Sequence, residues 1–155
     1  MHPNRLVAEG IEGGVISELQ GYEAIRREVK VSPQSRLDLR LERCDERCWC
    51  EVKNVTLGID GVAAFPDAVT ERGTRHLREL IRLARRGERA ALVFVVQRGD
   101  CETFRPADEI DPEYGRWLRR AAANKVEILV YQARVTPREI RLVRPLPLRL
   151  QVVDM

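Results

Sequence analysis

Residues 35–53 read SRLDLRLERCDERCWCEVK, and the prediction of the fold starts from this stretch. Leucines alternate with charged residues from Leu37 to Leu41, and a second alternation runs from Cys48 to Lys53. A period of two is typical of β-strands, because successive side chains point to opposite faces of a sheet. We therefore predict two antiparallel strands joined by a four-residue loop, residues 43–46.

The register of this hairpin follows from the two alternations. Pairing Glu42 with Arg47 places one apolar set opposite another. The facing residues are Leu37, Leu39 and Leu41 on the first strand and Val52, Cys50 and Cys48 on the second. On the other face Asp38 lies opposite Glu51, and Lys53 points to the same side. A slip of one residue would mix the two faces, so the pattern specifies this register.

Asp38, Glu51 and Lys53 form a candidate metal centre. Opposed residues of an antiparallel pair lie about 5 Å apart at their Cβ atoms, so the two carboxylates repel each other unless a cation lies between them. Mg²⁺ or Mn²⁺ suits such a pair, because it is held by one or two carboxylates and keeps several waters. A nearby lysine can orient or deprotonate the attacking water, or stabilise charge on a phosphate. The alternative is the solvated polar face of an amphipathic hairpin.

Periodicities outside the hairpin predict the remaining elements. The N-terminal segment has apolar residues at helical spacing with Asn4 as its N-cap, although Gly13 and Gly14 weaken its second half. Residues 90–96, AALVFVV, are typical of a central strand covered on both faces. Asp111-Pro112-Glu113 is typical of a helix start. The predicted elements are a helix over 4–19, a strand over 22–31, the hairpin, a turn over 58–61, a helix over 70–86 with Gly87 as its C-cap, a strand over 90–96, a helix over 111–123 and strands within 126–143.

The composition bounds what the whole chain can be. Its 155 residues suffice for one domain, 1–155, and a net charge of +3 does not by itself imply a nucleic-acid partner. The longest apolar run, 90–96, is far shorter than the roughly 20 residues that span a bilayer, and the N-terminus lacks a secretory signal. We therefore expect a cytoplasmic protein with no membrane partner. The four cysteines match no common zinc pattern, so we expect buried thiols, no zinc and no organic cofactor.

A row of arginines predicts contact with phosphates. On the helix over 70–86 the row consists of Arg75, Arg78, Arg82 and Arg85, at spacings of three, four and three. Such a row binds phosphates without reading sequence, and the alternative is an ordinary solvated face of an arginine-rich chain. Further candidates for nucleic-acid contact are Arg36, Thr70, Arg72 and His76. For His76 the alternative is a structural role with its hydrogen bonds satisfied inside the fold.

The order of the predicted elements resembles the core of the PD-(D/E)xK nuclease superfamily. That core has a helix, three strands carrying Asp and then Glu-x-Lys, a second helix and a further strand, and the order expected here is α-β-β-β-α-β-α-β. Asp38 takes the place of the first acid. The literal Pro66-Asp67 follows Glu51 and Lys53, which is the wrong order for the motif. The resemblance implies an α/β restriction-endonuclease-like fold, a mixed sheet flanked by helices.

Longer stretches resemble one family within this class. They are SRLDL (35–39), CEVKNVTL (50–57), AAFPDAVTERGTRHLREL (63–80), FVVQR (94–98) and FRPADEIDPEY (104–114). Together they resemble the sugar fermentation stimulation protein A family, over residues 4–148. The resemblance implies a nuclease-like domain, an association with DNA and a regulatory role in sugar metabolism. Members usually also carry an N-terminal OB-like β-barrel, which we expect this chain to lack.

The resemblance also carries site residues onto this sequence. Its acidic and lysine positions correspond to Asp38, Glu51 and Lys53, and the N-terminal helix offers Glu9 as a third metal ligand. The first hypothesis is a DNA-binding protein with an Mg²⁺- or Mn²⁺-dependent phosphodiesterase site and backbone contacts that do not depend on base sequence. The second is a non-enzymatic DNA-binding regulator of sugar (maltose) metabolism genes. A third is a protein-interaction module without nucleic-acid affinity, which a salt-sensitive gel shift would exclude.

Overall fold

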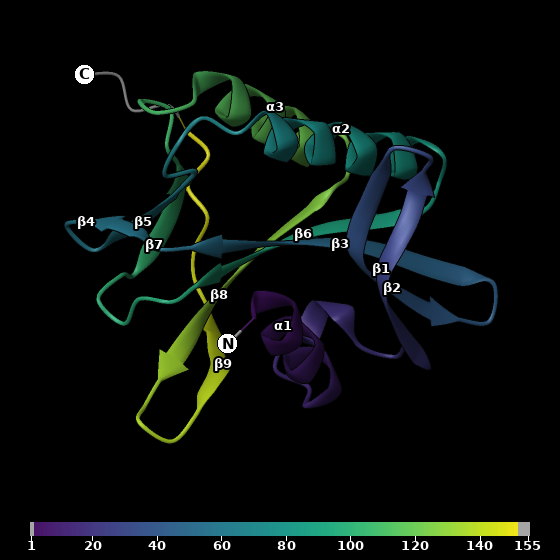
Figure 1. Ribbon diagram of the computed structural model, residues 1–155, viewed down its shortest axis with the longest axis horizontal. Coiled ribbons are helices and arrows are strands. Elements are labelled where there is room, and N and C mark those ends of the chain that lie inside the picture. Colours follow the sequence, from purple (N-terminus) through teal and green to yellow (C-terminus); the bar gives the residue numbers. More distant parts are fainter. Residues whose placement is uncertain (1, 152–155) are drawn as a thin grey trace.

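The computed structural model describes residues 2–151 as a six-stranded mixed sheet between two helical layers (Figure 1). Helices α2 (Glu71–Arg85) and α3 (Pro112–Ala123) cover one face, and α1 (Pro3–Glu12) lies against the other. In sheet order the strands are β1 (Ala24–Ser32), β2 (Ser35–Arg43), β3 (Glu46–Val55), β6 (Arg89–Val96), β8 (Glu127–Val135) and β9 (Ile140–Pro145). The three central strands run parallel and the outer pairs are antiparallel. The predicted mixed sheet flanked by helices is confirmed.

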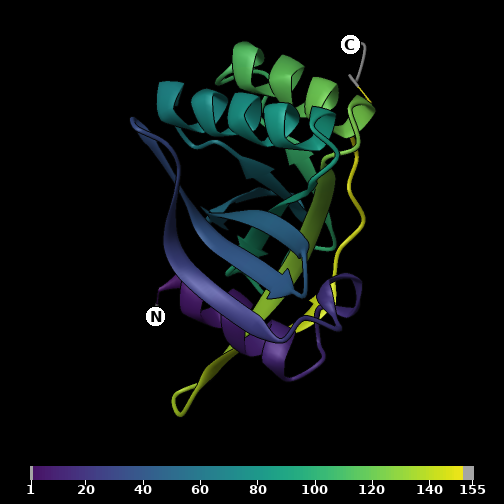
Figure 2. The same ribbon diagram turned by 90° about the vertical axis from the view of Figure 1, so that its right-hand side faces the viewer.

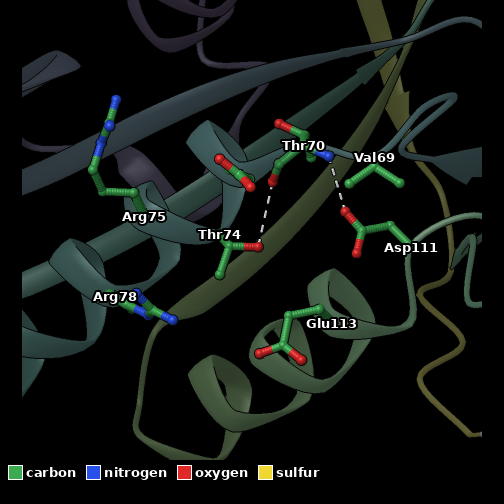
Figure 3. A pocket seen from close by; sticks show the side chains of 8 residues that line it. Val69, Thr70, Thr74, Arg75, Arg78, Asp111 and Glu113 are labelled. Atoms are coloured by element: carbon green, nitrogen blue, oxygen red, sulfur yellow. Dashed lines mark hydrogen bonds between the residues drawn. The ribbon is translucent and has the colours of Figure 1, made fainter.

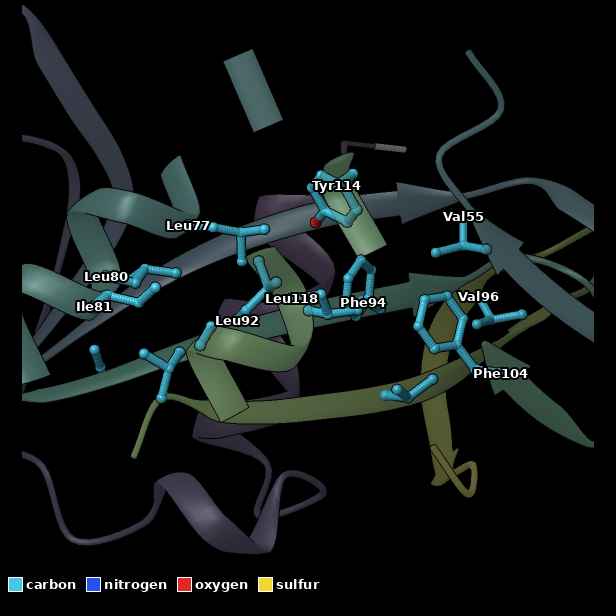
Figure 4. Close-up of a cluster of buried hydrophobic side chains, with 14 of the residues drawn as sticks. Val55, Leu77, Leu80, Ile81, Leu92, Phe94, Val96, Phe104, Tyr114 and Leu118 are labelled. Carbon is cyan, nitrogen blue, oxygen red and sulfur yellow. The ribbon is translucent and has the colours of Figure 1, made fainter. Parts of the chain in front are cut away.

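Strand β6 forms the centre of the sheet, and every residue from Ala90 to Val96 is buried. Its alternate side chains enter two separate cores. Leu92, Phe94 and Val96 pack beneath α2 and α3 (Figure 4), and Ala91, Val93 and Val95 pack on the side of α1. This strand is therefore covered on both faces, as its continuous apolar run predicts.

Three short strands form a second sheet that the sequence does not predict. They are β4 (Leu57–Ile59), β5 (Val62–Phe65) and β7 (Thr103–Pro106). The turn expected over 58–61 joins β4 to β5. The observed element order is therefore longer than the expected α-β-β-β-α-β-α-β, because strands of three or four residues are too short to show a clear period of two.

The β2–β3 hairpin has the expected register over its paired part, from Leu39–Cys50 to Arg43–Glu46. The four-residue loop is wrong, because both strands continue until only the dipeptide Cys44-Asp45 is left to turn. Cys44 adopts a φ of 52°, the left-handed conformation that tight hairpin turns use. Because it lies in this turn it is exposed, so the expectation of buried thiols is wrong for Cys44, whereas the other three cysteines are buried.

The expected continuous apolar face breaks at Leu37. Leu39 packs on the α1 side of the sheet, whereas Leu37 packs on the side of α2. Regular pairing stops at Leu39. Beyond that point the side chains of Asp38 and Glu51 accept hydrogen bonds from main-chain N–H groups of the facing strand, so the two strands no longer pair through their backbones.

The N-terminal helix is shorter than the predicted 4–19. It ends at Glu12, and Gly14 then adopts a φ of 79°, which a residue with a side chain rarely takes. A short 3₁₀ turn, Ser17–Leu19, follows. The N-cap is His2, whose side chain accepts a hydrogen bond from the N–H of Asn4. The amide side chain of Asn4 is therefore available for another partner.

The two longer helices begin at side-chain caps. Thr70 caps α2 and Asp111 caps α3, and each accepts a hydrogen bond at 3.0 Å from the N–H three residues on. The C-cap of α2 is Arg86 and not the expected Gly87, which follows it with a φ of 87° and ends the helix one residue further on. The predicted bounds of both helices are right to within one residue. Within residues 2–151 no helix combines the length and the apolar character needed to cross a membrane.

Candidate active site

The candidate site lies where regular pairing between β2 and β3 ends. Oδ2 of Asp38 accepts a hydrogen bond of 2.8 Å from the N–H of Val52. In return, the N–H of Asp38 donates to Oε1 of Glu51 at 3.1 Å. Each carboxylate thus satisfies a backbone donor that the ladder would otherwise satisfy. The backbone of the neighbouring strand therefore fixes the position of both acids.

Asn4 connects α1 to this site. Its Nδ2 donates to Oδ1 of Asp38 at 2.9 Å, so both oxygens of that carboxylate have a partner. The sequence pattern predicts Asn4 as a helix cap and gives no sign of this contact. No sequence signal distinguishes the two roles, because asparagine at a helix start is ordinary in either case.

His76 of α2 and Lys53 of β3 converge on the second oxygen of Glu51. Nδ1 of His76 lies 2.5 Å from Oε2 of Glu51, and Nζ of Lys53 lies 3.2 Å from the same oxygen. Nζ and Nδ1 are 2.9 Å apart. Glu51 and His76 are each only 3% exposed. The three side chains therefore form one buried polar cluster, and His76 is a partner of the carboxylate as well as a residue of the adjoining groove.

The two acids differ in their affinity for a proton. Burial, together with the neighbouring Glu51, raises the pKa of Asp38 to about 7. Burial also acts to raise the pKa of Glu51. Side-chain hydrogen bonds with His76 and Asp38, together with the charge of Lys53, outweigh this effect and lower the pKa of Glu51 to about 2. Glu51 therefore carries the negative charge. Asp38 beside it is favoured in its protonated form, and its ionised form would be stabilised by a cation.

Glu9 does not join this pair. It points to solvent on α1 and forms an ion pair of 2.9 Å with Arg5, one helical turn away. In the part of the chain that the structure describes, no three His, Cys, Asp or Glu side chains are arranged to hold a metal ion. The expected third carboxylate is thus not at the site, because Glu9 lies on the exposed side of α1 and the residue of α1 that reaches Asp38 is Asn4.

A cavity of about 420 Å³ adjoins the cluster, between the β1–β2 hairpin and α2. Figure 2 shows the end of this hairpin standing beside α2. Its charged lining, which we call the basic groove, consists of Lys30, Arg36, Arg72 and Arg75, with His76 beside them. All four cationic side chains are exposed, and none forms an ion pair with a residue in 2–151. The groove can therefore bind an anion without first breaking an internal salt bridge.

Only the first member of the expected arginine row lines the groove. Arg78 lies over the ring of Trp117, with its guanidinium carbon 4.7 Å from the ring centroid. Arg82 pairs with Glu79 at 2.8 Å, and Arg85 donates to Asn124. Arg78 and Arg85 therefore hold α2 against α3, whereas Arg82 is engaged by a residue of α2 itself. Thr70 likewise uses its hydroxyl to cap α2.

The fold and the site together define a class of protein: an α/β domain with an Asp–Glu–Lys cluster at the end of a strand pair and, beside it, a groove of cations that form no ion pair within residues 2–151. Residues 1–139 match the family described as "Sugar fermentation stimulation protein RE domain". The chain therefore belongs to the sugar fermentation stimulation protein family, as the resemblance in its sequence predicts.

Individual relatives agree with this assignment. The chain is 60% identical over 145 residues to the sugar fermentation stimulation protein homolog of Geobacter sulfurreducens, covering 94% of this chain and 62% of that protein. It is 60% identical to the Geotalea daltonii homolog over 148 residues, covering 96% and 64%. The solved structure of Pyrococcus furiosus SfsA in complex with Ca²⁺ superposes with a TM-score of 0.85 at 33% identity, covering 91% of this chain and 61% of that one. The chain thus spans less than two thirds of the length of these relatives.

Proposed function

We propose that this chain is a divalent-metal-dependent phosphodiesterase that acts on DNA, with the site arrangement of a PD-(D/E)xK nuclease. The observation that carries the proposal is the convergence of Asp38, Glu51 and Lys53 beside the basic groove. Two fixed carboxylates supply ligands for a hard cation, a lysine lies next to them, and the exposed cations of the groove flank them where a phosphate backbone would lie.

The donor set fits Mg²⁺ or Mn²⁺. A carboxylate has roughly four acceptor positions; Asp38 uses two of them and Glu51 three, so both retain capacity for a cation. Two carboxylates suffice for an ion that keeps most of its waters. The Ca²⁺ in the archaeal relative supports a hard-cation site in this family. When bound, such an ion would polarise a phosphoryl oxygen and lower the pKa of a coordinated water.

The protein's own residues would divide the remaining tasks. Lys53, held beside Glu51, would orient the attacking water or stabilise charge that develops on the phosphate. Asn4 and His76 would act as positioning residues, because Asn4 hydrogen-bonds the carboxylate of Asp38 and His76 contacts the carboxylate of Glu51. The basic groove would hold neighbouring phosphates of the strand.

Groove arginines and helix arginines are expected to differ in their effect on DNA binding. Arg36→Ala and Arg75→Ala should each weaken binding to any DNA sequence and reduce the slope of log K against log salt by about 1, because each removes one phosphate contact. Arg82→Ala is the matched control, since Arg82 already pairs with Glu79. Binding isotherms at several salt concentrations measure the slopes. An equal loss of slope in all three variants would contradict this assignment.

Metal-dependent cleavage tests the proposed activity. Plasmid and single-stranded DNA are incubated with the protein in Mg²⁺, in Mn²⁺ and in EDTA, and strand breaks are quantified on gels. We expect breaks with either metal and none in EDTA. A folded, metal-binding protein that cleaves neither substrate would instead support a purely DNA-binding role.

That second candidate, a non-enzymatic DNA-binding regulator of sugar metabolism genes, is favoured by one observation. Oε2 of Glu51 is already contacted by both Lys53 and His76, which leaves this acid fewer free positions for a cation than Asp38 has. A regulator would keep the basic groove and bind DNA equally well with and without a divalent metal. The cleavage assay and the salt titration together separate the two functions.

A further inference from the structure

A second cavity, of about 500 Å³, lies between the start of α2 and the start of α3 (Figure 3). Its volume falls within the range of sites that hold small organic ligands. Figure 3 shows Arg75 and Arg78 projecting from α2, with Thr70 and Thr74 nearby and Glu113 on α3. The full lining is Val69, Thr70, Glu71, Thr74, Arg75, Arg78, Asp111 and Glu113. None of these residues contributes to the metal centre proposed above.

Arg75 joins this cavity to the candidate site. It lines both the cavity and the basic groove, and it directly precedes His76, which contacts Glu51. A nucleotide whose phosphate is bound by Arg75 in the basic groove would therefore be close enough to place its base and sugar in the cavity. The two hollows are adjacent parts of one surface.

The groups in the cavity are suited to a nucleoside. Val69 is 71% exposed at its edge and offers an apolar surface to a flat ring. The hydroxyls of Thr70 and Thr74 retain hydrogen-bonding capacity, because among residues 2–151 the Thr70 hydroxyl accepts only from the N–H of Gly73 and the Thr74 hydroxyl donates only to the carbonyl of Thr70. The carboxylate of Glu71 makes no hydrogen bond within residues 2–151 and is free to accept from a base amine or a sugar hydroxyl.

We propose that this cavity is a nucleoside subsite, which takes the base and sugar of an unpaired nucleotide whose phosphate lies at Arg75. The inference rests on the proposed function and extends it to a substrate class, nucleic acid with single-stranded or locally unpaired nucleotides. A paired base cannot enter, because its edge and faces are occupied inside the duplex and extruding it costs free energy.

Binding to single-stranded and duplex DNA tests the subsite. Labelled oligonucleotides of about 12 nucleotides, a typical site size for such proteins, are titrated with the protein in EDTA, and fluorescence anisotropy gives the dissociation constants. The test variant is Val69→Asp, which places a carboxylate at the cavity edge. Its matched control is Ile59→Asp, because Ile59 is 56% exposed on β4 and lines neither cavity. We expect wild type to prefer the single strand, and Val69→Asp to weaken single-strand binding by about tenfold through charge repulsion and lost apolar contact while changing duplex binding much less.

The outcomes separate this inference from the function on which it rests. Equal single-strand affinity of Val69→Asp and Ile59→Asp, with wild type binding DNA in a salt-dependent way, overturns the subsite and leaves the phosphodiesterase proposal standing. Equal weakening of single-strand and duplex binding by Val69→Asp also overturns it, because that result indicates a general electrostatic effect. Failure of wild type to bind any DNA at low salt removes both proposals.

Discussion

Lys53→Met should slow metal-dependent DNA cleavage by about 10²–10³-fold, the usual loss when one group that stabilises transition-state charge is removed. Nζ of Lys53 lies 3.2 Å from Glu51 and is the ammonium group nearest the acid pair. Methionine retains the length and apolar stem of the side chain and removes the charge, so the fold should be kept. Metal affinity should stay the same or rise slightly, because Glu51 loses a competing cation. Single-turnover rates with saturating protein separate this effect from DNA binding.

Lys125→Met is the matched control for that variant. Lys125 is an exposed lysine just after α3 and takes no part in the site or the groove, so its replacement should leave the rate unchanged. If Lys53→Met cleaved DNA at the rate of Lys125→Met, Lys53 would have no catalytic role and the cluster would be structural. A lost metal affinity in Lys53→Met would indicate instead that the variant disturbs the carboxylate pair.

Asp38→Asn should have two opposite effects on stability. In wild type a divalent ion at 100 times its dissociation constant should stabilise the fold by about 2.7 kcal/mol, and this gain should vanish in the variant because one of the two ligands is gone. Without metal, however, the variant should be the more stable protein near pH 8. An ionised Asp38 lies beside the Glu51 charge, and the amide removes that repulsion while still accepting from the N–H of Val52. Thermal unfolding with EDTA and with Mn²⁺ measures both effects.

The pH dependence of this difference follows from the direction of the pKa shift. Burial and Glu51 raise the pKa of Asp38 to about 7, above the roughly 3.9 of an unfolded chain, so the folded state disfavours the charged form. Metal-free wild type should therefore lose stability relative to Asp38→Asn as the pH rises from about 4 to about 7, and the difference should be constant above that range. A metal-free wild type that stays more stable than the variant at pH 8 would contradict the proposed repulsion.

The hairpin was predictable because the residues that determine its register lie close together in the sequence. Two alternating runs, joined by a short polar segment, allow one register that keeps leucines and cysteines together, and the structure has that register from Leu39–Cys50 onward. The proximity of Asp38 and Glu51 follows directly from it. The departure at Leu37 did not follow, because it depends on side chains replacing main-chain partners, which alternation cannot indicate.

The other contacts of the site arise from packing between distant elements. Asn4 reaches Asp38 across 34 positions, and His76 reaches the Lys53 ammonium across 23. Helical spacing places Arg75 and Arg78 in one row, but their surroundings depend on distant elements, because Arg78 packs on Trp117 of α3 and Arg75 lines the groove beside the β1–β2 hairpin. Glu9 was misplaced for the same reason, because helix periodicity gives a face but not the neighbour that the face meets.

Calorimetric titration with Mn²⁺ tests most directly the claim that the acid pair is a metal centre. Wild type, Glu51→Gln and Glu9→Gln are compared under identical conditions, the last as a carboxylate-to-amide control outside the site. We expect one saturable site in wild type and in Glu9→Gln, and its loss in Glu51→Gln. Equal binding by Glu51→Gln and wild type would contradict it and would make the pair a structural feature of the hairpin.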